Sequence, residues 1–297
     1  MRPDPRADVD GYLARLGLDR PSRPDAQWLF AAHRAHISRV PYENLEIQLK
    51  RPTTVDPVEA IARIARGRGG YCFHLNGALG TLLACLGYDV TRHLGQVRGV
   101  DADQDAPELT INHQVLTVRC AGGEYPQYFV DCGLGDAPFE PLPLRAGVSV
   151  QGPFSYRLEP WAQREGGWRF VHDPRAESFP SMVFAPEPVE FSAFAQAHQH
   201  LSTSPDSGFV QAAVVGRRTA QALEVLRGRV FVRNDGVQVT KEPIDTRAQW
   251  YELLADVFGL TLPEIDTAAR ERLWQRVSRA HEQWLAKQEQ NQARVSA

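Results

Sequence analysis

The sequence predicts an α/β protein in three parts: an N-terminal helical bundle, an antiparallel β-barrel and a C-terminal α/β lid. Apolar residues recur at helical spacing in the first part, and from Tyr88 onward they alternate with polar residues as in strands. Many short strands at close spacing favour a sheet that curls into a small barrel. A proline-rich run at 185–188 then opens a third part of mixed pattern. The predicted parts are 1–87, 88–188 and 189–297.

Composition argues against several classes of function. The 297 residues carry a net charge of −3, with 43% hydrophobic and 23% charged residues, which is typical of a globular protein with a large core. No basic block is present, so nucleic acid is not expected as a partner. The chain has neither the roughly 18 apolar residues of a membrane span nor an apolar signal core, and we expect a cytoplasmic protein with no membrane partner. Its four cysteines lack metal-ligand spacing, so no metal is expected and the thiols should stay reduced.

The first part is predicted to be helical. Apolar residues recur at the spacing of amphipathic helices at residues 9–16, 25–38 and 58–66. Asp25 opens the second of these segments and Asp56 lies before the third, and both are favourable N-caps. His33 and His36 lie three residues apart on one helix, and without a cysteine or carboxylate to complete a ligand set we interpret them as surface residues.

A cysteine follows a glycine-rich turn in this first part. Gly67, Gly69 and Gly70 end one helix, and an apolar run at 75–86 predicts the next, so Cys72 lies at or just before a helix N-terminus. The unpaired N–H groups and positive dipole end there stabilise a thiolate, which makes a nucleophile. The alternative is a buried structural cysteine, which the glycines and the helix start make less favoured.

Two strands of the second part carry groups that could serve such a nucleophile. His113 lies on the apolar face of a predicted strand at 109–118, and Asp131 ends the next strand, 128–131, beside a glycine loop. A lone histidine on an apolar face is more often a core residue. Cys72, His113 and Asp131 together, however, form the nucleophile, base and orienting carboxylate of a triad like that of cysteine proteases. Further strands are predicted at 88–97, 155–159, 168–172 and 181–184.

The third part is predicted to mix helix and strand. A helix at 190–200 ends in a turn rich in serine and threonine, whose hydroxyls can cap and turn the chain. Amphipathic helices at 246–258 and 266–290 close the chain. Strands are expected at 209–215, 217–224, 230–233 and 238–240, with a hairpin turn at 234–236 (NDG) between the last two.

Five blocks of this sequence resemble one known family. They are 40–45 (VPYENL), 68–73 (RGGYCF) with Asn76, 112–113 (NH), 130–135 (VDCGLG) and 201–209 (LSTSPDSGF). In order and spacing they resemble the arylamine N-acetyltransferases, acetyl-CoA-dependent cysteine enzymes of xenobiotic metabolism. The resemblance implies that acetyl-CoA acetylates Cys72, with His113 as its partner and Asp131 as the third member. It also implies that a small-molecule arylamine, hydrazine or hydroxylamine accepts the acetyl group.

The resemblance assigns substrate-binding residues as well. The set comprises Gly133, Leu134, Gly135, Thr203 and Ser204. The first three lie in the loop expected to line the acceptor pocket. Backbone N–H groups of this loop and around the cysteine are expected to stabilise an oxyanion, commonly worth ~3 kcal/mol. The last two residues are expected at the phosphate end of the coenzyme.

Two supporting residues also match the family, and two other positions differ from it. Glu43 is expected to pair with Arg68 and to hold the turn that carries the cysteine. The family usually has a glutamate at the position of His74 and often an aromatic residue at that of Leu134. Neither is a triad position, so we expect the cysteine chemistry to survive, whereas the preference for small aromatic amines stays open.

Other functions remain as alternatives. An amide synthase of the same family, which closes macrolactams in polyketide biosynthesis, would share the triad but take another acyl donor. A non-catalytic binding protein could keep the fold, although an intact triad argues against it. A cysteine protease shares the triad chemistry, but nothing outside the triad indicates one. A homo-oligomer is compatible with the sequence.

Overall fold

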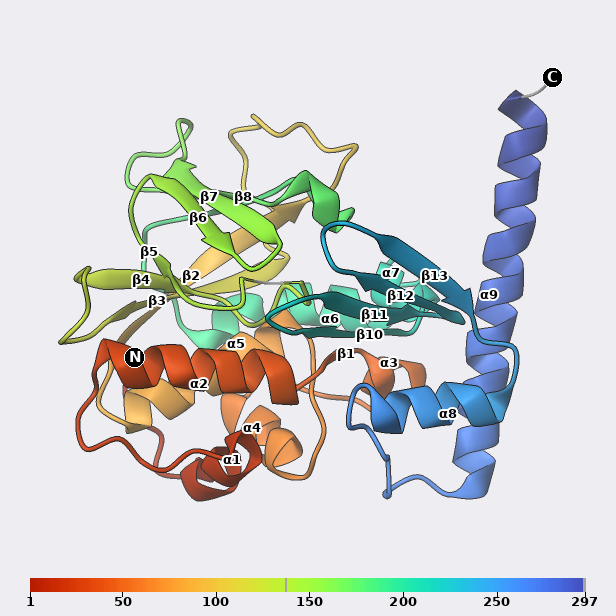
Figure 1. The fold of residues 1–297 in the computed structure, drawn as a ribbon, viewed down its shortest axis with the longest axis horizontal. Helices are drawn as coiled ribbons and strands as arrows, with labels where there is room; N and C mark the ends of the chain where they lie inside the picture. The colour runs from red at the N-terminus through yellow and green to blue at the C-terminus, as the bar shows by residue number, and fades with distance from the viewer. Residues whose placement is uncertain (137, 296–297) are drawn as a thin grey trace.

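A computed structural model describes residues 1–136 and 138–295 of the chain. Helices gather near the N-terminus beside a large curled sheet, and a smaller sheet with a long final helix lies on the other side (Figure 1). No described helix is long and apolar enough to cross a membrane. The N-terminal helices are α1 (Val9–Leu16), α2 (Ala26–Arg39), α3 (Leu45–Gln48), α4 (Pro57–Ala65) and α5 (Cys72–Cys85).

Polar caps fix where these helices begin, as the sequence predicts. Asp25 accepts a hydrogen bond from the N–H of Trp28 at 2.9 Å, and Asp56 accepts one from the N–H of Val58 at 2.9 Å. Helix α5 is different, because it is buried along almost its whole length and its leucines pack against the first strands of the large sheet. The helix that begins at Cys72 is therefore part of the core.

The large sheet has eight antiparallel strands in the order β5-β4-β3-β2-β9-β8-β7-β6. Its edge strands β5 and β6 are joined by residues 144–146 alone, so the two edges lie close together. The predicted barrel is thus confirmed in a nearly closed form, with stacked Phe129, Phe170 and Phe184 in its core. The bounds are β2 (Asp89–Arg98), β3 (His113–Arg119), β4 (Gln127–Val130), β5 (Leu142–Pro143), β6 (Gly147–Gln151), β7 (Phe154–Pro160), β8 (Trp168–Val171) and β9 (Ser181–Phe184).

Strand β3 is shorter than the predicted strand at 109–118. The Asn112 side chain replaces the backbone ladder to β2, since the Val97 N–H donates to Asn112 Oδ1 at 2.7 Å and Asn112 Nδ2 donates to Val97 O at 2.9 Å. Residues 109–111 therefore leave the sheet. This places His113 at the start of the strand.

The smaller sheet has five antiparallel strands in the order β1-β10-β11-β12-β13. Its edge strand β1 belongs to the N-terminal helical region and pairs with β10, with Tyr42 opposite Gly216. This pairing joins segments far apart in the sequence, and the boundaries at 87 and 188 stay a prediction. The bounds are β1 (Tyr42–Glu43), β10 (Val214–Arg218), β11 (Leu223–Arg227), β12 (Val230–Asn234) and β13 (Val239–Pro243).

Two strand predictions in the third part are wrong. A helix, α7 (Gly208–Gln211), occupies the start of the predicted strand at 209–215, because Ser207 caps it by accepting from the Phe209 N–H at 3.2 Å. A turn closed by Thr219 divides the predicted strand at 217–224. The remaining helices are α6 (Ala195–Thr203), α8 (Arg247–Asp256) and α9 (Thr267–Val295), with short 3-10 helices η1 (Pro174–Ala176) and η2 (Phe191–Phe194).

Candidate active site

Cys72 is the first residue of α5, and it is 3% exposed. The extended backbone of Tyr71 turns the chain into the helix at this point, so the first N–H groups of α5 have no partner within the helix. Cys72 lines a cavity of about 590 Å³, and its other lining residues come from the large sheet and its loops, from the smaller sheet and from helices α6 and α7. The sequence prediction of a cysteine at a helix start therefore agrees with the structure.

His113 and Asp131 meet at this cavity. His113 Nε2 lies 2.7 Å from Asp131 Oδ2, and both side chains are buried. Burial alone would lower the pKa of His113, but the Asp131 carboxylate and its hydrogen bond, with a smaller contribution from Cys72, raise that pKa to about 10. The ring is therefore a cation at neutral pH. Because Nε2 faces the Asp131 carboxylate, Nδ1 is the ring nitrogen that can pair with Cys72.

Asn76 fixes the Asp131 carboxylate, a role that sequence reasoning did not assign. Asn76 Nδ2 donates to Asp131 Oδ1 at 2.9 Å and to Gln114 O at 2.6 Å. Its Oδ1 accepts from the Cys132 N–H at 2.9 Å. One side chain thus joins α5 to β3 and to the end of β4. The available signal was its position four residues after Cys72, which puts both side chains on one helix face.

The interpretation of His33 and His36 as surface residues is wrong. His33 is 1% exposed and His36 is fully buried. His33 Nε2 lies 3.2 Å from the backbone oxygen of Asp131, and His36 Nδ1 lies 2.6 Å from the hydroxyl of Tyr12. His33 thus supports the residue that holds the His113 ring.

Gly133 lies so close to Cys72 that no side chain fits between them. A Cβ on Gly133 would lie 2.7 Å from Cys72 Cα and 2.9 Å from Asn76 Nδ2. The Gly133 N–H donates to Asp131 Oδ1 at 2.8 Å. Because this N–H is committed to the carboxylate, the expectation that it stabilises an oxyanion is wrong.

The other expected substrate residues lie in two different places. Leu134 lines the cavity, whereas Gly135 is absent from the described lining. Thr203 and Ser204 lie at the end of α6, where Thr203 Oγ1 donates to Gln199 O at 2.7 Å. These hydroxyls lie outside the described lining, and their role towards the coenzyme stays a prediction.

Arg68 and Glu43 form the expected ion pair, within a larger cluster. Arg68 Nη2 lies 3.0 Å from Glu43 Oε1, and its Nη1 lies 2.6 Å from Glu46 and 2.5 Å from Glu264. Burial opposes the charge on Arg68, but the three carboxylates raise its pKa. The cluster therefore ties the turn before the cysteine to β1, to α3 and to the segment that precedes α9.

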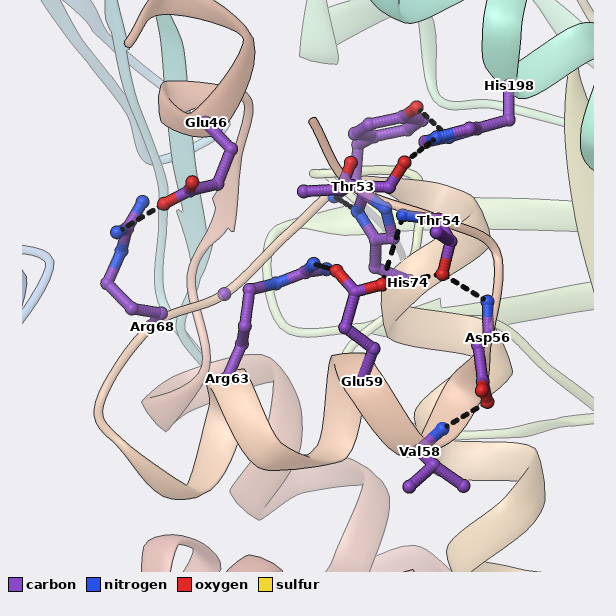
Figure 2. A network of polar contacts seen from close by, with 12 residues as sticks. Glu46, Thr53, Thr54, Asp56, Val58, Glu59, Arg63, Arg68, His74 and His198 are labelled. Atoms are coloured by element: carbon purple, nitrogen blue, oxygen red, sulfur yellow. Dashed lines mark hydrogen bonds and ion pairs between the residues drawn. The ribbon is translucent and has the colours of Figure 1, made fainter. Parts of the chain in front are cut away.

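A second polar network holds Tyr71, the residue before Cys72. Figure 2 shows two of its members, His74 and His198. The Tyr71 hydroxyl lies 2.5 Å from Nδ1 of His198 on α6, and the Tyr71 N–H donates to His74 Nδ1 at 3.4 Å. Burial and the nearby charge of Arg63 lower the pKa of His74, so its ring is neutral. A neutral histidine therefore occupies the position at which the family that this sequence resembles usually has a glutamate.

The cavity combines apolar walls with a few charged groups. Its volume is in the range of small-molecule sites. Among the described residues, no group of histidine, cysteine and carboxylate side chains could hold a metal ion. The charged lining residues are His113, Asp136, Glu177, Arg227 and Lys241, and the apolar ones include Val97, Leu134, Phe179, Leu201, Phe209 and Leu223.

Comparison with known proteins agrees with this arrangement. The N-acetyltransferase family model matches residues 25–267. An arylamine N-acetyltransferase of Mycolicibacterium smegmatis is 34% identical over 263 residues, which cover 87% of this chain and 94% of the relative. The structure of the Mycobacterium marinum arylamine N-acetyltransferase in complex with CoA matches with a TM-score of 0.81 and 28% identity, covering 92% of this chain and 99% of that chain.

A partial match concerns a different activity. Proansamycin X synthase of Amycolatopsis mediterranei is 30% identical over 156 residues, which are 51% of this chain and 58% of that protein. The family model and the mycobacterial relatives extend over much more of the chain. The chain therefore belongs to the arylamine N-acetyltransferase family.

Proposed function

We propose that this protein transfers an acetyl group from acetyl-CoA to an arylamine, hydrazine or hydroxylamine through an acetyl-Cys72 intermediate. The observation that carries the proposal is the hydrogen bond of 2.7 Å between His113 and Asp131, at a cavity that Cys72 also lines. A buried imidazolium beside a sulfur at a helix start favours the thiolate, which attacks thioesters. Xenobiotic amines as acceptors and a cytoplasmic location belong to the same proposal.

The reaction runs in two half-reactions. The Cys72 thiolate attacks the thioester carbonyl, and the tetrahedral intermediate expels the coenzyme A sulfur, which takes the proton of His113. The acceptor amine then attacks acetyl-Cys72, gives one proton to the neutral His113 and displaces the Cys72 thiolate. The amide leaves and the ion pair is restored. Asp131 orients the His113 ring and stabilises its charged form in both half-reactions.

Backbone and cationic groups suit the rest of the substrate. The N–H of Cys72 lies in the first turn of α5 and has no partner within the helix, so it is suited to the oxyanion. Arg227 and Lys241 line the cavity and suit the phosphates of the coenzyme. Thr203 and Ser204 remain candidates for the same end of the coenzyme.

Initial-rate kinetics with acetyl-CoA and aniline test the proposal. A two-step mechanism predicts parallel lines in double-reciprocal plots, and Cys72→Ala should remove all turnover. Cys85→Ala is the matched control, because Cys85 is a half-buried free thiol outside the described cavity lining. Intersecting lines, or turnover by the Cys72→Ala protein, would refute the mechanism.

The partial match to proansamycin X synthase supports a second candidate, an amide synthase with a longer acyl donor. The two candidates differ in the thioester that acylates Cys72. Acylation can be followed by mass with acetyl-CoA and with a long-chain acyl thioester of N-acetylcysteamine. Faster acylation by acetyl-CoA favours the acetyltransferase, and acylation by the long-chain thioester alone favours the synthase.

A further inference from the structure

A buried carboxylate, that of Asp136, lies in the wall of the active-site cavity. Asp136 is 6% exposed and lines the cavity together with Cys72 and His113. Its Oδ2 lies 3.4 Å from Nε2 of His172, whereas none of the described residues makes a hydrogen bond to its Oδ1. A buried carboxylate whose hydrogen bonding is incomplete costs free energy, so a donor group that enters the cavity can gain by pairing with it.

His172 keeps this carboxylate charged. Burial would raise the pKa of Asp136, but His172 and the neighbouring Ser178 lower it. The pKa of His172 is raised, because the effect of the Asp136 carboxylate outweighs that of burial. The imidazole is also fixed in place, since its Nδ1 lies 3.2 Å from the backbone oxygen of Asp173. The cavity thus contains a positioned anion.

The other cations of the lining are His113, which Asp131 holds at 2.7 Å, and the exposed Lys241 and Arg227. Lys241 is engaged by Glu177 at 3.5 Å, and both side chains are more than half exposed. Arg227 is also exposed and forms no ion pair with a described residue. The loop that carries Asp136 presents the apolar Leu134 to the cavity instead of a second charge.

We propose that Asp136 selects acceptors that carry a cationic or N–H donor group in addition to the amine that is acetylated. Such a group would donate a charge-assisted hydrogen bond to the Asp136 carboxylate. An acceptor with a carboxylate would instead meet a like charge in a poorly hydrated site. The inference rests on the proposed function, because it concerns the amine that attacks acetyl-Cys72.

The test compares kcat/KM for matched acceptors, namely the 3- and 4-isomers of aminobenzamidine and aminobenzoate, with aniline as the neutral reference. The wild-type enzyme should prefer the better amidine isomer to the better benzoate by roughly tenfold or more, as expected for one charge-assisted contact against one like-charge contact. Asp136→Asn should reduce this ratio to near one, with a smaller change for aniline. An unchanged ratio in this variant would overturn the inference.

The control variant is Glu140→Gln, in the loop that follows Asp136. Glu140 pairs with Arg34 at 2.7 Å and lies outside the described cavity lining, so the ratio should stay as in the wild type. The preference among acceptors is measured on the wild-type enzyme itself. Equal kcat/KM values for the amidine and the benzoate therefore overturn the inference even if Asp136→Asn fails to fold.

Release of coenzyme A without any amine separates this inference from the proposed function. If the wild-type enzyme forms no acetyl-Cys72, the proposed function fails. If it forms acetyl-Cys72 but shows no preference among the acceptors, only the role of Asp136 fails.

Discussion

At the level of single residues, the site is held by short polar contacts between segments that are far apart in sequence. His113 begins β3, Asp131 follows β4, and Asn76 lies on α5, yet Asp131 makes contacts of 2.7 Å and 2.9 Å with the other two. The pKa of His113 rises to about 10 because of this arrangement, against the effect of burial. The charge of Asp131 therefore decides whether Cys72 has a cation beside it.

Asp131→Asn keeps the shape of the side chain and removes this charge. Burial should then lower the pKa of His113, the thiolate should lose its cation, and alkylation of Cys72 by iodoacetamide at pH 7 should slow by roughly tenfold or more. Peptide mapping by mass spectrometry measures the rate at each cysteine. Cys85 is an internal control, because it is a half-buried free thiol outside the described cavity lining, and its rate should be the same in both proteins. Equal rates for Cys72 in both proteins would contradict the ion pair.

The sequence predicted that Cys72, His113 and Asp131 come together, but it did not predict the residues that hold them in place. Cys72, His113 and Asp131 stand in motifs with helix, strand and glycine signals around them. His33 and Asp136 have no such local signal, since their roles depend on burial and on partners that only the folded chain brings near. A histidine or an aspartate in the sequence is equally compatible with an exposed position on the surface.

Among the elements, the start of α5 and the loop after β4 depend on each other. Gly133 allows the loop to approach the Cys72 backbone, where a Cβ would lie at 2.7 Å from Cα. This approach also brings the Gly133 N–H to the Asp131 carboxylate at 2.8 Å. The loop thus sets both the position of Cys72 and the orientation of the Asp131 carboxylate.

Gly133→Ala should therefore displace Cys72 or the loop. A shift of about 1 Å can cost ~100-fold in rate, so we expect a loss of kcat/KM of that order. Gly208→Ala is the control, because nothing lies within 4 Å of a Cβ built there. It should act like the wild type in the same assay. An active Gly133→Ala protein would show that the loop does not set the position of Cys72.

Elements with local signals were predicted well, and elements that depend on distant partners were not. Asp25 and Asp56 cap their helices within the same segment, so the pattern alone was sufficient. Strand β3 begins late because Asn112 bonds to Val97 on another strand. The two-residue strand β1 exists only because it pairs with β10, which local pattern does not show.

At the scale of the whole molecule, buried histidines determine how stability responds to acid. Burial lowers the pKa of these rings, whereas in an unfolded chain they titrate near ~6.5. Below that pH the unfolded chain binds protons that the folded chain does not, so stability falls as pH falls. The histidines of this kind are His33, His36, His74, His93 and His198.

His113 and His172 have the opposite effect. Their pKa values are raised in the folded chain, so their contribution to stability is complete below ~6.5 and is lost as pH rises through the folded pKa, about 10 for His113. The two sets of histidines together predict greatest stability near neutral pH.

His36→Gln tests whether buried neutral histidines cause the loss of stability at acid pH. The pKa of His36 falls to about 3 through burial and neighbouring positive charges, so the residue stays neutral in the folded chain at pH 4–6. One such proton contributes up to about 1.4 kcal/mol per pH unit to the slope of unfolding free energy. Urea unfolding at pH 6, 5 and 4 should show a shallower loss of stability in the variant. Parallel profiles would contradict a neutral His36, whatever the absolute stability of the variant.

The most direct test of the central claim is the mass of the intact protein after mixing with acetyl-CoA alone, followed by an arylamine. Transfer through Cys72 should give a gain of one acetyl group, located on Cys72 by peptide mapping, and its loss when the amine is added with formation of the amide. An acetyl group on another residue, or amide formation without any acetyl-protein, would contradict transfer through Cys72.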